Sequence, residues 1–197
     1  PCVAAVLREQ ISGLANVTVI EGDVLKMAVP RFSKVVSVPP YYLSSRLVMW
    51  LFDRGFEFAV LILQREFARR LVAEVGIDAY GWLTVVAFHS AAVELLDPVP
   101  RLMFYPPPEV DSVMVRFKPW QTAPFEVADE AFFRRMVKLL FTQRNRKVGN
   151  ALEPFVKRTL KTSKENARNV CDLGFCEKRV RELPPNAFGE LANALTR

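Results

Sequence analysis

The stretch KVVSVPPYYLSSRLVMWLF, residues 34–52, changes its pattern in the middle. Its first part, residues 34–38, is rich in β-branched valines, which favour a buried strand. Its last part begins an apolar helical pattern that runs over residues 43–53. Pro39 and Pro40 stand between the two parts and fix the backbone there. The stretch therefore predicts a strand, a rigid turn and a helix.

The segments on either side repeat this alternation. Residues 58–63, FAVLIL, form a continuous apolar run, as expected for a strand of a parallel sheet that is covered on both faces. Residues 64–74 follow with the pattern of an amphipathic helix, and upstream the spacing predicts a helix over 2–12 and a short strand over 17–20. Alternating helices and strands indicate βαβ units and an α/β fold.

The pattern changes after residue 78. Residues 79–82 open a short helix, and two strands are predicted over 93–96 and 112–117 on either side of a proline-rich connection at 102–108. Such a pair is antiparallel, which is a common end for an otherwise parallel sheet.

The last third of the chain is predicted to be a small helical module. Residues 119–124 have the composition of a linker, and helices are predicted over 128–142, 145–158, 163–173, 176–182 and 186–196. Between Arg134 and Arg181 there are fourteen Lys or Arg residues and four acids. This excess indicates either solvated helix faces or a surface that contacts phosphates.

The composition restricts the class of protein. The 197 residues are 51% hydrophobic and carry a net charge of +6, which is typical of a globular chain and favours an acidic partner such as nucleic acid. The odd number of cysteines, Cys2, Cys171 and Cys176, argues against a disulfide framework, and with His89 as the one histidine no metal site is expected. No apolar run is long enough for a membrane helix, and no signal peptide is expected.

The proline turn has a chemical interpretation beside its structural one. Ligands of open α/β sheets bind at the carboxyl ends of the strands, where this turn is predicted to lie. Rigid carbonyl acceptors beside the flat ring of Tyr41 would suit an extruded base that carries an exocyclic amine. A purely structural Pro-Pro turn is the alternative, and these residues alone do not separate the two.

The turn resembles the N-L-P-Y-x-I-S motif of S-adenosylmethionine-dependent rRNA adenine N6-dimethyltransferases, the KsgA family. Other segments match that family in the same order along nearly the whole chain. The most specific is FYPPPEVDS at 104–112, which is close to the family's FxPPPxVDS. The others are VTVIEGDV at 17–24, LQREFARRL at 63–71, YGWL at 80–83 and QRNRKVGN at 143–150.

The resemblance implies a Rossmann-like methyltransferase domain over residues 1–120 and a helical, basic RNA-binding domain over 121–197. It also implies the methyl donor S-adenosylmethionine and a partner, the small-subunit rRNA of an immature 30S-type subunit, on which adjacent adenosines are dimethylated. A monomer in the cytoplasm, with no membrane contact, is expected. The implied catalytic residues are Val38, Pro39, Pro40, Tyr41 and Phe104, with the Pro40 carbonyl on the target amine and the two rings around the target base. Asp23, Val24 and Val38 are the implied donor-binding residues, and Arg144, Arg146 and Lys147 the implied RNA-binding residues.

The chain departs from the family pattern in two places. Val38 stands where the family has an asparagine, whose side-chain oxygen would accept a hydrogen bond from the target amine. In addition, residues 1–33 hold no glycine-rich loop of the GxGxG type, so the first βα unit of the methyltransferase domain is expected to be missing, and residues 1–197 alone to bind the methyl donor weakly. Two alternatives follow from these departures: a weak or inactive relative that assists ribosome assembly, and a DNA-binding relative.

Overall fold

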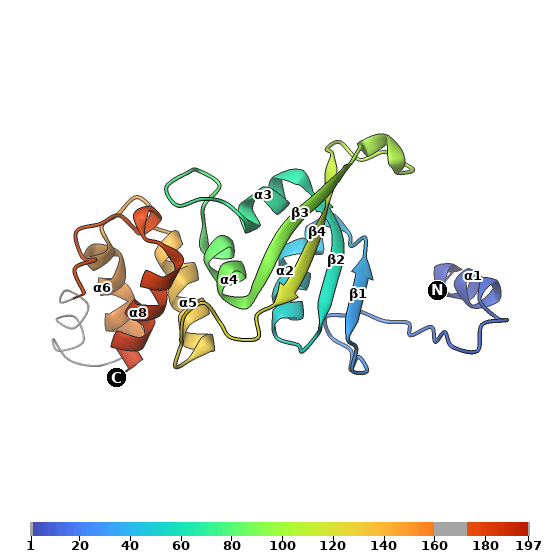
Figure 1. Ribbon diagram of the computed structural model, residues 1–197, viewed down its shortest axis with the longest axis horizontal. Coiled ribbons are helices and arrows are strands. Elements are labelled where there is room, and N and C mark those ends of the chain that lie inside the picture. Colours follow the sequence, from blue (N-terminus) through green and yellow to red (C-terminus); the bar gives the residue numbers. More distant parts are fainter. Residues whose placement is uncertain (1, 160–172, 197) are drawn as a thin grey trace. The chain divides into compact units, whose positions relative to one another are not determined.

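The computed structural model describes residues 2–159 and 173–196 and divides the chain into two compact units, Pro1–Phe32 and Ser33–Arg197. Figure 1 shows the elements of both units. In the described part of the chain, no helix is both long and apolar enough to cross a bilayer.

The first unit consists of a helix and a series of turns. Helix α1, Cys2–Gln10, confirms the predicted helix, and Arg8 forms an ion pair with Glu21 at 3.1 Å. The predicted strand over 17–20 is wrong, because these residues form no ladder with any strand in the described ranges. A β-branched run favours extended backbone, but a strand also needs a neighbouring strand to accept its hydrogen bonds.

The second unit is built on a four-stranded mixed sheet in the order β1-β2-β4-β3. Strands β1, Lys34–Ser37, and β2, Phe58–Gln64, are parallel, whereas β4, Ser112–Pro119, pairs antiparallel with both β2 and β3, Ala91–Val99. The α/β class with an antiparallel end pair is thus confirmed. The expectation that β2 has parallel neighbours holds only for its β1 side.

One face of the central pair of strands, β2 and β4, is buried. Ala59, Leu61 and Leu63 of β2 lie directly opposite Phe117, Val115 and Val113 of β4, and all six side chains are buried. The residues between them on β2 are only half-buried, so the expected equal cover on both faces is not found. Because successive side chains of a strand point to opposite faces, this alternation identifies the face that packs on the helices.

Helices α2 and α3 follow the strands β1 and β2, and α4 precedes β3. The turn η1, Tyr41–Leu43, leads into α2, Ser44–Phe52, and Phe52 packs edge-on against Phe117 of the sheet, with ring centroids 6.0 Å apart. Helix α3, Arg65–Leu71, begins directly after β2. Helix α4, Trp82–Ser90, begins after Gly81, whose N–H donates to the Thr84 hydroxyl at 3.1 Å. These helices confirm the three predicted ones.

The C-terminal region is helical, with one correction. Helices α5, Glu130–Phe141, α6, Val148–Thr159, and α8, Pro185–Thr196, confirm three predictions, and Asp129 caps α5 by accepting from the Phe132 N–H. The predicted helix over 163–173 lies almost entirely outside the described residues. The predicted helix over 176–182 is wrong, apart from the single turn η3, Val180–Glu182.

The reason lies in a backbone pairing between distant residues. The Val148 N–H donates to the Lys178 carbonyl and the Val180 N–H to the Arg146 carbonyl, around a bridge between Lys147 and Arg179. Backbone groups that bond across the fold in this way cannot also form the i to i−4 bonds of a helix.

The C-terminal helices share their core with the sheet region. Tyr80, Val85 and Val86 belong to the same buried cluster as the apolar side chains of α5, α6 and α8. The Tyr80 hydroxyl donates to the Leu183 carbonyl at 2.7 Å, and burial raises the pKa of this phenol. The helical region is therefore packed on α4, and a domain boundary at residue 120 stays a prediction.

Candidate active site

The predicted strand, turn and helix lie at the carboxyl end of β1. Val38 to Pro40 leave the strand, and Pro40 has φ −55° and ψ 131°. The Leu43 N–H then donates to the Pro40 carbonyl at 2.9 Å, which closes η1. The Pro39 ring is buried, whereas Pro40 is exposed. The two prolines thus hold a short extended segment between two hydrogen-bonded elements.

Tyr41 is held in place by a residue that lies far from it in the sequence. Its hydroxyl lies 2.6 Å from the Ser112 hydroxyl, and the Ser112 side chain is completely buried. Ser112 is the first residue of β4 and pairs with Gln64 at the end of β2. The half-buried Tyr41 ring therefore lies at the edge of the sheet where β1 and β2 end. Its neighbour Tyr42 is 83% exposed.

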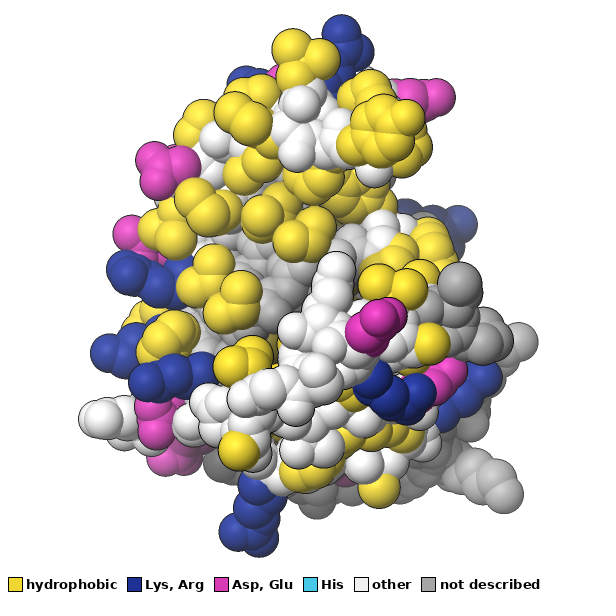
Figure 2. All heavy atoms as spheres, turned by 90° about the vertical axis from the view of Figure 1, so that its right-hand side faces the viewer, with side chains coloured by type: hydrophobic (Ala, Val, Ile, Leu, Met, Phe, Trp, Pro, Cys, Tyr) yellow, Lys and Arg dark blue, Asp and Glu magenta, His cyan; other side chains and the backbone are white. Residues whose placement is uncertain are grey.

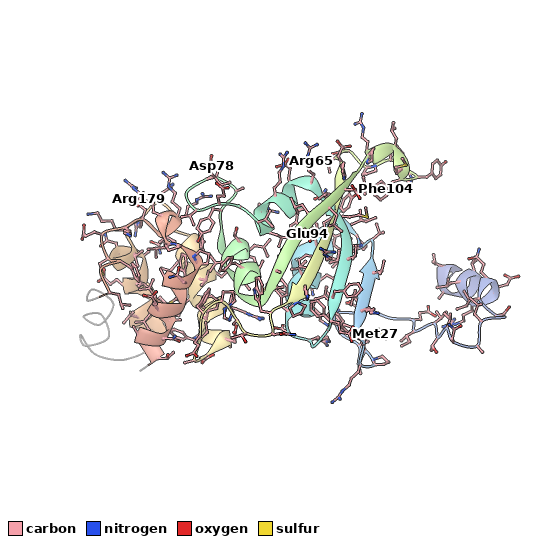
Figure 3. The ribbon with its side chains drawn as sticks, in the orientation of Figure 1. Met27, Arg65, Asp78, Glu94, Phe104 and Arg179 are labelled. Carbon is pink, nitrogen blue, oxygen red and sulfur yellow. The ribbon has the colours of Figure 1, made fainter. Side chains whose placement is uncertain are left out.

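Phe104 comes from the loop that joins β3 to β4 at this same edge. It follows the turn η2, Arg101–Met103, and its ring is half-exposed. Figure 3 shows Phe104 at the end of β3 and Arg65 at the start of α3, both at the upper edge of the sheet. In the described part of the chain, neither the Phe104 ring nor the Tyr41 ring stacks on another aromatic ring. Their pairing around a base stays a prediction.

Residues 38–40 offer backbone acceptors but no side-chain acceptor. The Val38 side chain is 54% exposed, and its methyl groups cannot accept a hydrogen bond. The Pro40 carbonyl uses one of its two lone pairs for the Leu43 N–H and keeps the second. A hydrogen bond that an amine donates to residues 38–40 must therefore be accepted by the main chain.

Asp23 and Val24 lie in the first unit. One carboxylate oxygen of Asp23 accepts from the Leu25 N–H at 3.0 Å, and the other lies 3.7 Å from the Lys26 ammonium. The Asp23 side chain is 45% exposed, so its outer oxygen can accept another N–H. An exposed carboxylate beside the apolar Val24 side chain fits the amine and the ring of an adenine.

The three basic residues predicted to bind RNA all have partners within the chain. The Arg144 guanidinium donates to the carbonyls of Ile77 and Asp78, at 3.1 and 2.8 Å. Arg146 donates to the Gln143 side chain at 2.9 Å, and Lys147 forms an ion pair with Glu177 at 2.5 Å. Arg144 therefore fastens the loop before α4. Arg146 and Lys147 are exposed side chains, and their partners Gln143 and Glu177 are half-buried and exposed, respectively.

The structure adds one group of side chains that the sequence did not assign. A cavity of about 540 Å³ opens between α3 and the loop after η2. Arg65 lies 3.8 Å from the Asp111 carboxylate, and the Arg101 N–H donates to the same carboxylate at 3.2 Å. The segments FYPPPEVDS and LQREFARRL contain most of these residues and were the available signal. The charged lining consists of Arg65, Glu66, Arg69, Arg101, Glu109 and Asp111.

Comparison with protein families gives one match over most of the chain. A family model described as ribosomal RNA adenine dimethylase matches residues 1–178. Similar curated proteins are the probable ribosomal RNA small subunit methyltransferases A of Haloquadratum walsbyi, Methanosarcina acetivorans and Natronomonas pharaonis, which are 37%, 38% and 41% identical over 96%, 99% and 90% of this chain. The chain spans 64%, 72% and 64% of the lengths of these relatives.

Solved structures with a similar fold come from related enzymes. A dimethyladenosine transferase from Plasmodium falciparum superposes with a TM-score of 0.80 at 26% identity, over 96% of this chain and 77% of its own. The 23S rRNA methyltransferase ErmE superposes with a TM-score of 0.67, also at 26% identity, over 100% of this chain and 79% of its own.

Proposed function

The chain belongs to the ribosomal RNA adenine dimethylase family, and we propose that the protein containing it methylates the N6 amines of adjacent adenosines in small-subunit ribosomal RNA, with S-adenosylmethionine as the methyl donor. The observation that carries the proposal is the contact between Tyr41 and Ser112. It holds an aromatic ring beside a proline turn at the carboxyl edge of the sheet, where ligands of open α/β sheets bind.

The target adenine is bound by stacking and by backbone carbonyls. Tyr41 and Phe104 take the two faces of the extruded base, each stacking contact being worth about 1–3 kcal/mol. The free lone pair of the Pro40 carbonyl accepts a hydrogen bond from the N6 amine. This bond draws the nitrogen toward a tetrahedral shape and makes its own lone pair available.

The transfer itself needs little from the chain beyond orientation. When bound, the donor supplies an electrophilic methyl carbon on a sulfonium. The donor would supply this methyl group to N6, with the electron pair of the broken carbon–sulfur bond staying on sulfur, and N6 would release its proton to water. The proline turn holds N6 in line for this step, so positioning accounts for most of the rate. In the first unit, Asp23 and Val24 would hold the adenine of the donor, because the 45% exposed Asp23 carboxylate can accept a hydrogen bond from its amine. In the second unit, the main chain of Val38 would offer the donor a further contact.

The Val38 position gives a direct test of this proposal. Val38→Asn in the native protein adds the missing side-chain acceptor, and one such hydrogen bond corresponds to roughly tenfold to a hundredfold in methyl-transfer rate. Transfer of labelled methyl groups to undermethylated small subunits measures the effect. Val36→Asn is the matched control, because Val36 lies on β1 and is 82% exposed. A rate that does not rise in Val38→Asn, with RNA binding preserved, favours the assembly-factor alternative.

The helical region is proposed to bind the RNA backbone through its basic side chains. We expect Arg146→Ala and Lys147→Ala each to make the salt dependence of rRNA binding less steep by about one unit of log–log slope. Arg144→Ala should also release the loop that its guanidinium fastens at Ile77 and Asp78. Lys118→Ala, an exposed lysine of β4, is the control. A slope that none of the three substitutions changes would assign these residues to ordinary surface.

The partner of this activity is an immature small ribosomal subunit. We expect the protein to act on it as a monomer in the cytoplasm. Preference for duplex DNA over rRNA in competition experiments at matched salt would favour the DNA-binding alternative instead.

A further inference from the structure

We propose that the tip of the β3–β4 loop, residues 101–105, is a wedge that enters the RNA loop beside the target adenosine and fills the gap left by the extruded base. This inference rests on the proposed function, because it names a second contact of the same site with its RNA. The tip consists of Arg101, Leu102, Met103, Phe104 and Tyr105.

The tip exposes more apolar surface than a solvated loop needs. Leu102 is 82% exposed, Met103 76% and Tyr105 100%. Single exposed apolar residues are common on protein surfaces, but three within four positions on one projecting loop form a patch that indicates a binding partner. Figure 2 shows hydrophobic side chains gathered at the upper end of this face, where the loop projects past β1 and β2 in Figure 1.

The tip is also held rigid. Pro100 precedes it, and the Met103 N–H donates to the Pro100 carbonyl at 3.0 Å. The Arg101 N–H donates to the Asp111 carboxylate at 3.2 Å, which ties the start of the tip to its return strand. Pro106 follows Tyr105 and restricts the backbone at the other end. A rigid apolar tip loses little conformational entropy when it inserts between bases.

The tip lies at the same sheet edge as the proposed base-binding turn. Val99, the last residue of β3, pairs with Ser112. Ser112 in turn lies 2.6 Å from the Tyr41 hydroxyl. Phe104, which is proposed to stack on the target base, is itself part of the tip. The residues on either side of Phe104 are therefore placed to contact the nucleotides on either side of that base.

The chemistry of the tip favours RNA over a protein partner. Proteins that unstack bases insert apolar side chains such as Leu and Met, and single-stranded bases stack on exposed aromatic rings such as Tyr105. The Arg101 guanidinium has no ion pair in the ranges that the structure describes, and Arg65 and Arg69 line the adjoining cavity. A cation beside an exposed aromatic ring suits a nucleotide, with the phosphate on Arg101 and the base on Tyr105.

The test uses the native protein and an RNA hairpin whose loop carries two adjacent adenosines, with 2-aminopurine in place of the target adenosine. The fluorescence of 2-aminopurine rises when the base leaves its stack, and the measurement needs no methyl donor. We expect the wild-type protein to raise this fluorescence. The triple variant Leu102→Ser, Met103→Ser and Tyr105→Ser should need roughly tenfold to a hundredfold more protein for the same rise, since stacking contacts are lost.

Two control variants separate the wedge from a general surface effect. Tyr105→Phe keeps the ring and should keep the fluorescence rise. Val72→Ser with Val75→Ser and Ile77→Ser removes three exposed apolar side chains from the loop after α3 and should also keep it. Unfolding temperatures of all variants should match that of the wild type within a few degrees, because each replaced side chain is exposed.

The outcomes distinguish the wedge from the proposed function. If the triple variant keeps the fluorescence rise, the wedge is overturned, and the exposed tip is then assigned to binding a protein partner. This outcome is compatible with methyl transfer. A wild-type protein that gives no rise also overturns the wedge. A rise that depends on the tip, in a protein that transfers no methyl groups to small subunits, supports the wedge and contradicts the proposed function.

Discussion

The hydrogen bond between Tyr41 and Ser112 makes an asymmetric prediction about stability. The two hydroxyl oxygens are 2.6 Å apart, but the Ser112 side chain is fully buried, whereas the Tyr41 ring is only half-buried. Tyr41→Phe therefore leaves a buried hydroxyl with no partner, which costs about 1–3 kcal/mol in the free energy of unfolding. For a chain of this size, that corresponds to a fall in Tm of roughly 2–12 °C.

The reverse change should cost less. Ser112→Ala leaves the Tyr41 hydroxyl near the surface, where water can replace the lost partner, so we expect about 0.5–1.5 kcal/mol. The double variant removes both hydroxyls, and replacing both partners of a buried hydrogen bond is often nearly neutral. The double variant should accordingly be more stable than Tyr41→Phe alone.

Urea unfolding followed by tryptophan fluorescence measures these differences, because all three tryptophans, Trp50, Trp82 and Trp120, lie in the second unit. Tyr42→Phe is the matched control. Its ring is 83% exposed, so its stability should agree with that of the wild type within about 0.5 kcal/mol. If the two single substitutions add in the double variant, the hydroxyls do not stabilise each other, and the argument that Ser112 positions Tyr41 is refuted.

Two further predictions concern the packing of the helical region. Gly189→Ala should destabilise the protein by about 1–3 kcal/mol, because the added Cβ would lie 2.5 Å from the Phe125 ring. In Gly149→Ala the added Cβ would lie 3.6 Å from its nearest neighbours, so this variant should be neutral or stabilising in thermal unfolding. His89 lies 2.6 Å from the Glu130 carboxylate, and this hydrogen bond holds the pKa of Glu130 below its ordinary value of 4.5. The stability that the carboxylate contributes is therefore present above pH 4.5 and is lost as the pH falls through the lowered pKa. Glu130→Gln should therefore destabilise the protein near neutral pH, and this loss of stability should shrink below about pH 4.5. Unfolding measured as a function of pH tests this, and a stability difference between variant and wild type that stays constant with pH would contradict it.

Local patterns in the sequence were sufficient for most of the elements. The valine run and the two prolines predicted β1 and its turn, and the apolar run at 58–63 predicted β2. These features depend on backbone restriction and on the period of apolar residues, both of which act over a few positions. The proline turn also predicted the edge of the sheet at which the candidate site lies, and the motif FYPPPEVDS carried the resemblance to the family to which the chain belongs.

The presence or absence of a distant hydrogen-bonding partner caused the two wrong element predictions. Residues 17–20 have the composition of a strand, yet no strand in the described ranges pairs with them. Residues 178–180 have a helical pattern, but their backbone groups bond to residues 146–148. In both cases the local preference was weaker than the requirement that backbone donors and acceptors find partners, and those partners are decided by the fold.

The sequence alone predicted most of the elements in their order, the proline turn and the family. Only the tertiary structure decided that the Tyr41 hydroxyl bonds to Ser112, 71 positions further along the chain. It also decided which basic side chain is hydrogen-bonded within the protein, as Arg144 is. The physical reason is one of range. Propensity and periodicity act between neighbours in the chain, whereas a hydrogen bond or an ion pair exists only once folding has brought its two partners together.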